Sequence, residues 1–349
     1  MKEGYLPKEQ RKKILLLCDD IRMHSGVSTM AREFVLGTCH KYNWINAGAA
    51  INHPEVGKRI DLSQDTGNRA GVEDASVFLL PQNGYGDSTL IRNMLKTEKP
   101  DAIFFFTDPR YWVWLFQIEN EVRAKAPMIY LNIWDNYPAP MYNQDYYESC
   151  DTLLAISKQT KNINEIVLGD KAKDKIIEYV PHGINEEHFF PINEEHKSWE
   201  QLQEAKKQLF GGKEYDHVFF FNSRNIRRKN VSNLIAAYSL FKENLPEDKK
   251  DKVALVLHTQ PVDNNGTDLF AVRDLFLGED DSVRFSQGKI STEAMNFLYN
   301  LADITVLPSN AEGWGLALTE SMMAGTMILA TVTGGMQDQM RFEDENGNW

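Results

Sequence analysis

The stretch ITVLPSNAEGWGLALTESMMAG, residues 304–325, predicts a short buried strand followed by a loop and a helix. The apolar run 304–308 ends at a proline, and the apolar spacing that begins at Leu316 has Gly325 behind it, which is typical of a helix end. A strand that passes through a short loop into a helix is the unit from which parallel, helix-covered sheets are built. The stretch therefore predicts an α/β fold.

Apolar runs of strand length alternate with amphipathic stretches of helix length along the whole chain, which is typical of doubly wound parallel sheets. The expected strands are residues 13–18, 76–81, 102–107, 128–134, 152–157 and 176–181 in a first series and 217–223, 252–259, 283–288, 304–308 and 327–332 in a second. The polar stretch 182–197 is expected to link the two series. We predict two Rossmann-like domains, residues 1–190 and 191–349, that face each other across a cleft at the carboxyl ends of the strands.

The composition excludes several classes of protein. Hydrophobic residues make up 42% of the 349 residues and charged residues 25%, as in ordinary globular proteins. General nucleic-acid binding is not expected, because 50 acidic residues against 38 basic ones give a formal net charge of -12. Three widely spaced cysteines favour a reducing compartment, and no run approaches the roughly 20 apolar residues of a membrane span. We expect a cytoplasmic protein without a transmembrane segment.

Two carboxylates, Glu312 and Glu320, lie on either side of a glycine-aromatic-glycine turn. Gly313 and Gly315 can take backbone angles that other residues avoid, so the loop can direct both acids into one pocket. The N–H groups at the helix entrance, at Gly315 and Leu316, suit a phosphate, and a carboxylate can accept hydrogen bonds from neighbouring sugar hydroxyls. The pattern predicts a sugar phosphate site. An exposed loop acid and a solvated helix acid are the alternative.

The second candidate site is the basic cluster RNIRRKN, residues 224–230, directly after an expected strand. Four cations at a strand-to-helix junction of an acidic chain indicate a bound anion. Arg224 offers a planar fork and Lys229 a compact charge, a mixture that suits two linked phosphates. A solvated surface patch is the alternative, and Arg227 and Arg228 are the members for which we expect it most.

Together these stretches resemble the retaining nucleotide-sugar glycosyltransferases of family four, the glycosyl transferases group 1 proteins with the two-domain GT-B fold. The resemblance rests on NSRNIRRKN (222–230), on STEAMNFLYNLADITVLPSNAEGWGLALTESMMAG (291–325) and on VPHGINEEHFFP (180–191). It implies that Glu312, Lys229 and Arg224 are catalytic, with Arg224 and Lys229 on the diphosphate. It also implies that Glu320 binds the ribose hydroxyls, and that the backbone of Trp314, Gly315 and Leu316 binds the donor sugar and phosphate together with Glu312.

The first half of the chain resembles the family less closely. HSGVSTMAREFV (24–35) is similar to the family's glycine-rich loop, with Gly26 as its second glycine and Ser25 in place of the first. Gly26 is therefore a candidate donor-binding residue, and an ordinary helix start is the alternative. Where the family often has a histidine beside the reacting sugar, this chain has Trp134 and Asp135. Asp135 is a candidate contact for the acceptor or the sugar, with capping of the following turn as the alternative.

We therefore expect a metal-independent hexosyltransferase that moves a sugar from a nucleoside diphosphate sugar to an acceptor hydroxyl with retention. No cofactor is expected, and the 8 histidines show no metal-ligand spacing. The acceptor is a saccharide, a lipid-linked sugar or a protein. A non-catalytic sugar-nucleotide-binding protein and a GT-B-fold epimerase or phosphorylase are the alternatives. The second domain is expected to be shortened relative to the family, because few residues follow Gly325.

Overall fold

The computed structural model describes residues 2–278, 280–341 and 344–347. The chain divides into two compact units, Met1–Gly183 and Ile184–Trp349. The expected boundary between residues 190 and 191 lies a few residues further along the same polar stretch.

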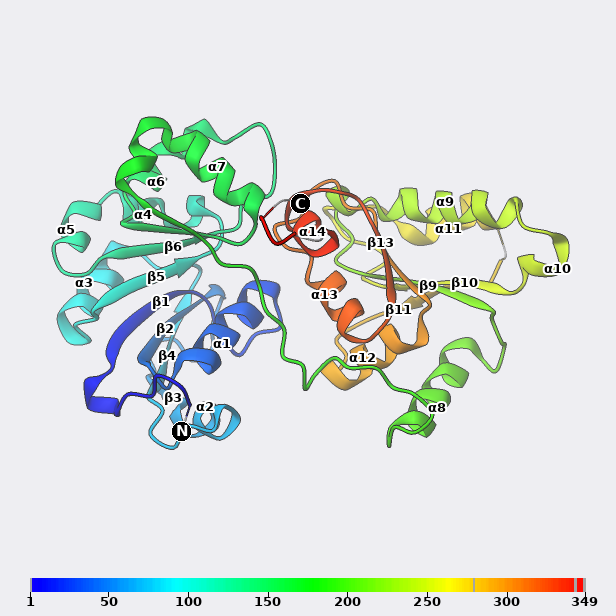
Figure 1. Ribbon diagram of the computed structural model, residues 1–349, viewed down its shortest axis with the longest axis horizontal. Helices are drawn as coiled ribbons and strands as arrows, with labels where there is room; N and C mark the ends of the chain where they lie inside the picture. The colour runs from blue at the N-terminus through cyan, green and yellow to red at the C-terminus, as the bar shows by residue number, and fades with distance from the viewer. Residues whose placement is uncertain (1, 279, 342–343, 348–349) are drawn as a thin grey trace. The chain divides into compact units, whose positions relative to one another are not determined.

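The first unit is built on an eight-stranded sheet (Figure 1). In spatial order its strands are β3 (Ile60–Asp61), β4 (Val77–Asn83), β2 (Tyr42–Ile51), β1 (Lys12–Asp19), β5 (Ala102–Phe106), β6 (Met128–Asn132), β7 (Thr152–Ala155) and β8 (Ile176–Tyr179). β3 pairs antiparallel with β4, and the other pairs are parallel. The chain order runs in opposite directions on the two sides of β1, so the sheet is doubly wound.

Three helices of this unit, α1 (Gly26–Thr38), α3 (Ser88–Thr97) and α7 (Lys158–Leu168), start at a capping side chain. Ser25 caps α1 by accepting a hydrogen bond from the N–H of Ser28 at 3.0 Å, and Asp87 and Ser157 cap α3 and α7 in the same way. The helices are α1 (Gly26–Thr38), α2 (Ser63–Ala70), α3 (Ser88–Thr97), α4 (Val113–Phe116), α5 (Glu119–Arg123), α6 (Gln144–Glu148) and α7 (Lys158–Leu168).

Strand β2 occupies the interior of the sheet, although the sequence analysis did not predict it. Its residues YNWINAGAAI interrupt large apolar side chains with asparagine, glycine and alanine, unlike the apolar runs of strands such as β1 and β5. Asn46 is fully buried and its side chain accepts from the N–H of Ile21 and donates to the carbonyl of Leu16, both at 3.2 Å. A Cβ at Gly48 would lie 3.0 Å from Cα of Asp20. The small and amide residues therefore let the loop after β1 lie directly on β2.

The second unit contains a five-stranded, fully parallel sheet in the order β11 (Val283–Ser286), β10 (Val253–His258), β9 (His217–Asn222), β12 (Ile304–Leu307) and β13 (Met327–Ala330). Its helices are α8 (Trp199–Phe210), α9 (Val231–Glu243), α10 (Glu247–Lys250), α11 (Leu269–Leu277), α12 (Thr292–Leu301), α13 (Leu316–Met323) and α14 (Gly334–Met340). All five predicted strands are present, and the order reverses at β9.

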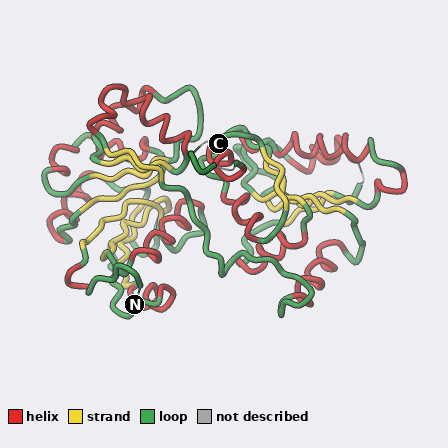
Figure 2. Tube along the Cα trace, in the orientation of Figure 1, coloured by secondary structure: helices red, strands yellow, loops and turns green. Residues whose placement is uncertain are grey.

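Helices lie on both faces of this sheet (Figure 2). Successive residues of β9 enter opposite cores: Phe221 packs with Leu255 and Leu257 in one, and Phe220 packs with Ala254 and Val256 in the other. A strand with two covered faces needs a continuous apolar run, which explains FFF at 219–221.

The structure confirms the predicted α/β class with two doubly wound sheets. No helix among the described residues is long and apolar enough to cross a membrane.

Candidate active site

The loops after β9 and β12 are joined at the carboxyl edge of the second sheet. Asn230 has a left-handed backbone, with φ of 54°, which asparagine tolerates better than most residues. Its amide donates to the carbonyl of Pro308 at 2.9 Å and to Oδ1 of Asn310 at 2.7 Å. The N–H of Asn310 donates in turn to the carbonyl of Arg228 at 2.8 Å. These bonds hold the basic cluster against the loop that carries Glu312.

Lys229 and Glu312 form a buried ion pair at this junction. The ammonium of Lys229 donates to Oε1 of Glu312, and the two side chains are only 10% and 6% exposed. Ser309 Oγ donates to the same oxygen at 2.7 Å, and Nη1 of Arg228 lies 3.3 Å from Oε2. Burial by itself would raise the pKa of Glu312, but the charges of Lys229 and Arg228 outweigh burial and hold the pKa below its ordinary value.

Two cationic side chains meet the carboxylate of Glu312 at this junction. Lys229 and Arg228 contribute two cations, and Glu312 contributes one anion. Because the pair is buried, solvent screens its charges less than it would screen the charges of a surface pair. The two cationic side chains are therefore suited to contact an anion.

Arg224 makes its contacts on the other side of the basic cluster. Its guanidinium forms a fork on Asp263, with Nε 2.7 Å from Oδ2 and Nη2 3.2 Å from Oδ1, and its side chain is 62% exposed. Asp263 belongs to the loop after β10. That loop packs closely on the cluster, because a Cβ at Gly266 would lie 2.2 Å from the carbonyl oxygen of Asn225. Lys229, by contrast, contacts the loop after β12.

Arg228 is the member of the basic cluster whose role the sequence analysis missed. It was expected to be solvated, yet its guanidinium donates to the carbonyl of Ala311 and to Glu312. Arg227 and Arg228 both lie in the single 3-10 turn Arg227–Lys229, and the sequence does not show which of two adjacent arginines turns toward the neighbouring loop.

Glu320 lies one turn inside α13, which begins at Leu316 as predicted. Oη of the fully buried Tyr299 donates to Oε2 of Glu320 at 2.6 Å, and the amide of Asn222 donates to the same phenol oxygen at 2.9 Å. Burial raises the pKa of Glu320 to about 7, and the hydrogen bond from Tyr299 opposes that shift in part. Tyr299 and Asn222 lie within the stretches that carry the family resemblance, but they were not predicted as site residues because neither side chain is charged.

The loop between Glu312 and α13 is supported by α14. Gly315 takes a φ of 89° at the helix entrance, and buried Trp314 donates from its indole to Thr319 at 3.0 Å. The N–H of Gly335 donates to the carbonyl of Glu312 at 3.1 Å, and a Cβ at Gly335 would lie 2.3 Å from the carbonyl of Gly313. The backbone of the loop is thus held from both sides.

The remaining candidates belong to the first unit. Gly26 opens α1, and Ser25 before it has extended backbone angles, with φ of -132° and ψ of 159°, that any residue can adopt. Ser25 also donates to Oδ2 of Asp19 at 2.7 Å, so the serine in place of the family's glycine fixes the loop to the end of β1. Asp135 follows β6, and its carbonyl accepts from the amide of Gln159 at 3.2 Å.

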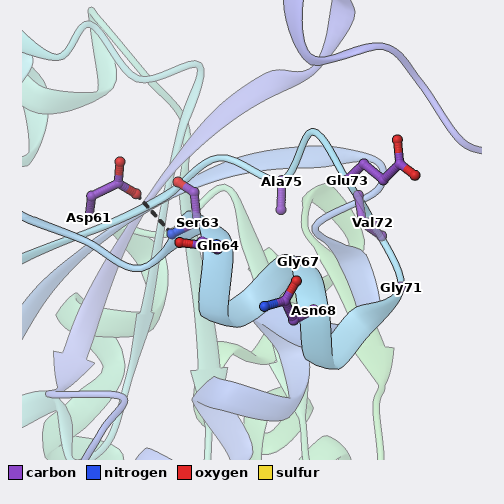
Figure 3. A pocket seen from close by; sticks show the side chains of 9 residues that line it. All are labelled: Asp61, Ser63, Gln64, Gly67, Asn68, Gly71, Val72, Glu73 and Ala75. Atoms are coloured by element: carbon purple, nitrogen blue, oxygen red, sulfur yellow. Dashed lines mark hydrogen bonds between the residues drawn. The ribbon is translucent and has the colours of Figure 1, made fainter.

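No three His, Cys, Asp or Glu side chains in the described part of the chain form a group that could hold a metal ion. A polar groove lies along α2 in the first unit, and Asp61, Ser63, Asn68 and Glu73 are among the residues that line it (Figure 3). None of the candidate residues named above lines this groove.

Comparisons with known proteins agree with this geometry. The profile of the family described as Glycosyl transferases group 1 matches residues 200–349. Residues 200–349 are a glycosyl transferases group 1 domain. This domain contains every candidate residue of the second unit, from Arg224 to Glu320. The match confirms the predicted family for this part of the chain.

Two curated relatives are similar to about half of this chain. A mannosylfructose-phosphate synthase from Agrobacterium fabrum is 28% identical over 195 residues, which is 54% of this chain and 39% of the relative. A D-inositol 3-phosphate glycosyltransferase from Corynebacterium jeikeium is 26% identical over 195 residues, which is 55% of this chain and 44% of the relative. The matched stretches thus span less than half the length of either relative.

A solved structure shows the same fold over nearly the whole chain. The structure of Anabaena HepE in complex with UDP and glucose superposes with a TM-score of 0.67 at 14% identity, and the match covers 97% of this chain and 85% of HepE. Its two Rossmann-like domains are those of a GT-B glycosyltransferase. The GT-B fold predicted from the sequence is therefore confirmed.

Proposed function

We propose that the chain is a retaining glycosyltransferase of family four that uses a nucleoside diphosphate sugar as its donor. The observation that carries the proposal is the buried Lys229–Glu312 pair, with Arg228 beside it, on the loop that leads into α13. This junction places two cationic side chains at the carboxyl edge of a doubly wound sheet, where such folds bind ligands. HepE, which shares the fold, is known as a complex with UDP and glucose.

In this proposal Lys229 and Arg224 bind the diphosphate. Negative charge develops on the leaving diphosphate as its bond to the anomeric carbon lengthens, so fixed cations stabilise the transition state more than the ground state. Lys229 is held in place for this role by Glu312. Arg224 reaches the diphosphate by exchanging its exposed contact with Asp263 for a phosphate.

Glu312, Glu320 and the loop between Glu312 and α13 bind the rest of the donor. Glu320 accepts hydrogen bonds from the ribose hydroxyls, and the N–H groups at Gly315 and Leu316 contact a phosphate at the entrance of α13. Glu312 and the backbone of Trp314 contact the donor sugar. The side chain of Glu312 thereby has two functions, since it also positions the ammonium of Lys229.

Transfer with retention follows from a front-face displacement in which the leaving phosphate helps to deprotonate the acceptor hydroxyl. No metal and no cofactor take part in this scheme. The acceptor is a saccharide, a lipid-linked sugar or a protein, with Asp135 as a candidate contact for it or for the donor sugar and Gly26 as a candidate donor contact. A cytoplasmic location stays a prediction of the sequence.

A thermal-shift screen over nucleoside diphosphates and their sugar conjugates tests the proposal, because a ligand that binds only the folded chain raises its melting temperature. We expect at least one nucleotide and its sugar conjugate to stabilise the protein, and the conjugate to be consumed when acceptors are added. No shift with any nucleotide would contradict the proposal. Binding without turnover on any acceptor would favour the non-catalytic alternative, and a requirement for free phosphate would favour a phosphorylase.

A further inference from the structure

Three buried or half-buried polar groups form a directional chain through the second unit. The amide N–H of Asn222 donates to the oxygen of Tyr299, and the hydroxyl of Tyr299 donates to Oε2 of Glu320. An amide N–H can only donate, so the phenol oxygen accepts from Asn222 and its single proton is directed to Glu320. The chain begins at the last residue of β9, two residues before Arg224, and ends on α13.

The second carboxylate oxygen of Glu320, Oε1, takes no part in this series of hydrogen bonds. Within the described residues Tyr299 is the hydrogen-bond partner of Glu320, and it contacts Oε2, so Oε1 receives no hydrogen bond from a described group. A carboxylate with one oxygen fixed by a buried donor presents the other in a single direction. This is the arrangement needed to accept hydrogen bonds from a pair of neighbouring hydroxyls.

We propose that Tyr299 is a positioning residue for the donor ribose, whose hydroxyl fixes the orientation of Glu320 so that Glu320 accepts from the ribose hydroxyls. This inference rests on the proposed function and assigns to it an uncharged residue of the stretch 291–325. Tyr299 suits the role because its ring is locked between Phe189 and Phe220, at centroid distances of 5.9 and 5.2 Å. The position of the Tyr299 hydroxyl is therefore fixed by the packing of its ring.

Tyr299 is the titratable residue that contacts the side chain of Glu320. The elements packed on α13 are α12, α14, β12 and β13. The two strands carry no titratable side chain, α14 carries Asp338, and α12 carries Tyr299 and the exposed Glu293. Glu320 is the only titratable residue of α13 itself. The ionisation of Glu320 is thus governed by its burial and by the hydrogen bond from Tyr299.

The proposed role of Tyr299 predicts a change in how the binding of a ribose-containing nucleotide depends on pH. A ribose that needs the carboxylate as acceptor binds more tightly as pH rises toward the pKa of Glu320, which is about 7, and its affinity is level above that value. Removing the hydroxyl of Tyr299 removes a hydrogen bond to the charged form, so the midpoint moves upward by about one pH unit. Affinity at pH 7 then falls by about fivefold, because the ionised fraction of Glu320 falls from about one half to about one tenth.

The experiment is titration calorimetry from pH 6 to pH 9 on the wild type and Tyr299→Phe. The probes are UDP, ADP or GDP, whichever stabilises the chain, and its 2′,3′-dideoxy analogue, which has the same phosphates but lacks the ribose hydroxyls. We expect the substitution to move the midpoint for the ribose ligand and to leave binding of the dideoxy ligand unchanged. An equal effect on both ligands, or an unmoved midpoint, would overturn the inference.

Two further variants separate positioning from stability. Tyr238→Phe is the matched control, because Tyr238 is also buried in the second unit but its hydroxyl contacts Ser282 and the carbonyl of Val253; it should leave the midpoint in place. Asn222→Ala should shift the midpoint in the same direction as Tyr299→Phe by a smaller amount. If the wild type bound no nucleoside diphosphate at any pH, the proposed function would fail; if it bound them but Tyr299→Phe behaved as wild type, only this inference would.

Discussion

Lys229 follows strand β9, Glu312 follows the neighbouring strand β12, and their side chains meet as a buried ion pair. The pair joins the two motifs that lie more than eighty residues apart in the sequence. Since removal of either partner leaves the other charge buried, each residue supports the position of the other. The basic cluster and the glutamate loop are therefore one site and not two.

Replacement of Lys229 by alanine should affect stability and binding together. The substitution leaves Glu312 buried without its ammonium partner, which should lower the free energy of unfolding by about 3 kcal/mol. Nucleoside diphosphate binding should fall by at least about a hundredfold, the loss expected when a charged contact to a phosphate is removed. Urea denaturation and titration calorimetry measure the two effects.

The matched control is Lys249→Ala, because Lys249 is 55% exposed and lies 3.4 Å from Asp216 in a surface pair. Surface pairs contribute about 0 to 1 kcal/mol, so this variant should bind and unfold as the wild type does. A Lys229→Ala protein that is folded and binds nucleotides normally would remove Lys229 from the site.

Asp263→Ala should strengthen donor binding. The exposed contact with Asp263 competes with the phosphate for the guanidinium of Arg224, and an exposed pair of this kind is worth up to about 1 kcal/mol. Release of Arg224 should therefore lower the Kd of a nucleoside diphosphate by up to about fivefold. The double variant Arg224→Ala, Asp263→Ala should lose this gain, and a gain that persists in it would show that Arg224 does not bind the ligand.

Gly335→Ala should disturb the loop between Glu312 and α13. Its Cβ would lie 2.3 Å from the carbonyl of Gly313 and 2.7 Å from Cα of Trp314, so the backbone must shift. We expect a loss of about 2 kcal/mol in stability, in the range for overpacking, and weaker nucleotide binding. Gly37→Ala is the control, because Gly37 lies in α1 with nothing within 4 Å of its Cβ, and the change should stabilise the helix by about 0.5 to 1 kcal/mol. Equal melting temperatures for the two variants would contradict this account of the loop.

Glu320→Gln should become more stable than the wild type as pH rises. The pKa of Glu320 is about 7 in the folded chain and near 4.5 when exposed, so the unfolded chain loses its proton first. The free energy of unfolding of the wild type therefore falls between these two pH values and is level above pH 7. Glutamine does not titrate, so the variant should gain on the order of 2 kcal/mol relative to the wild type between pH 5 and pH 8. Urea denaturation at both pH values measures the gain, and Glu293→Gln, at the exposed start of α12, should show none.

Much of the fold could be predicted because parallel sheets leave a strong pattern. Strands such as β5 and β9 are buried on both faces and require uninterrupted apolar runs. Strand β2 was not predicted. The loop after β1 lies directly on it, so it requires small residues and the buried Asn46, and these residues are typical of a loop in sequence.

The charged half of the site could also be predicted, since Lys229, Glu312 and Glu320 belong to recognisable motifs. The contacts that arrange them could not. Whether Arg224 or Arg228 turns toward Glu312 depends on one turn of 3-10 helix, and the link from Asn222 through Tyr299 to Glu320 depends on three elements packing together. Such contacts are set by tertiary structure and leave no local pattern.

The most direct test is a crystal structure of the chain with a nucleoside diphosphate chosen by the thermal-shift screen. The account predicts phosphate oxygens within about 3 Å of the Lys229 ammonium and of the N–H at Leu316, with the ribose hydroxyls on Glu320. A diphosphate bound elsewhere, with the Lys229–Glu312 pair untouched by ligand, would contradict it.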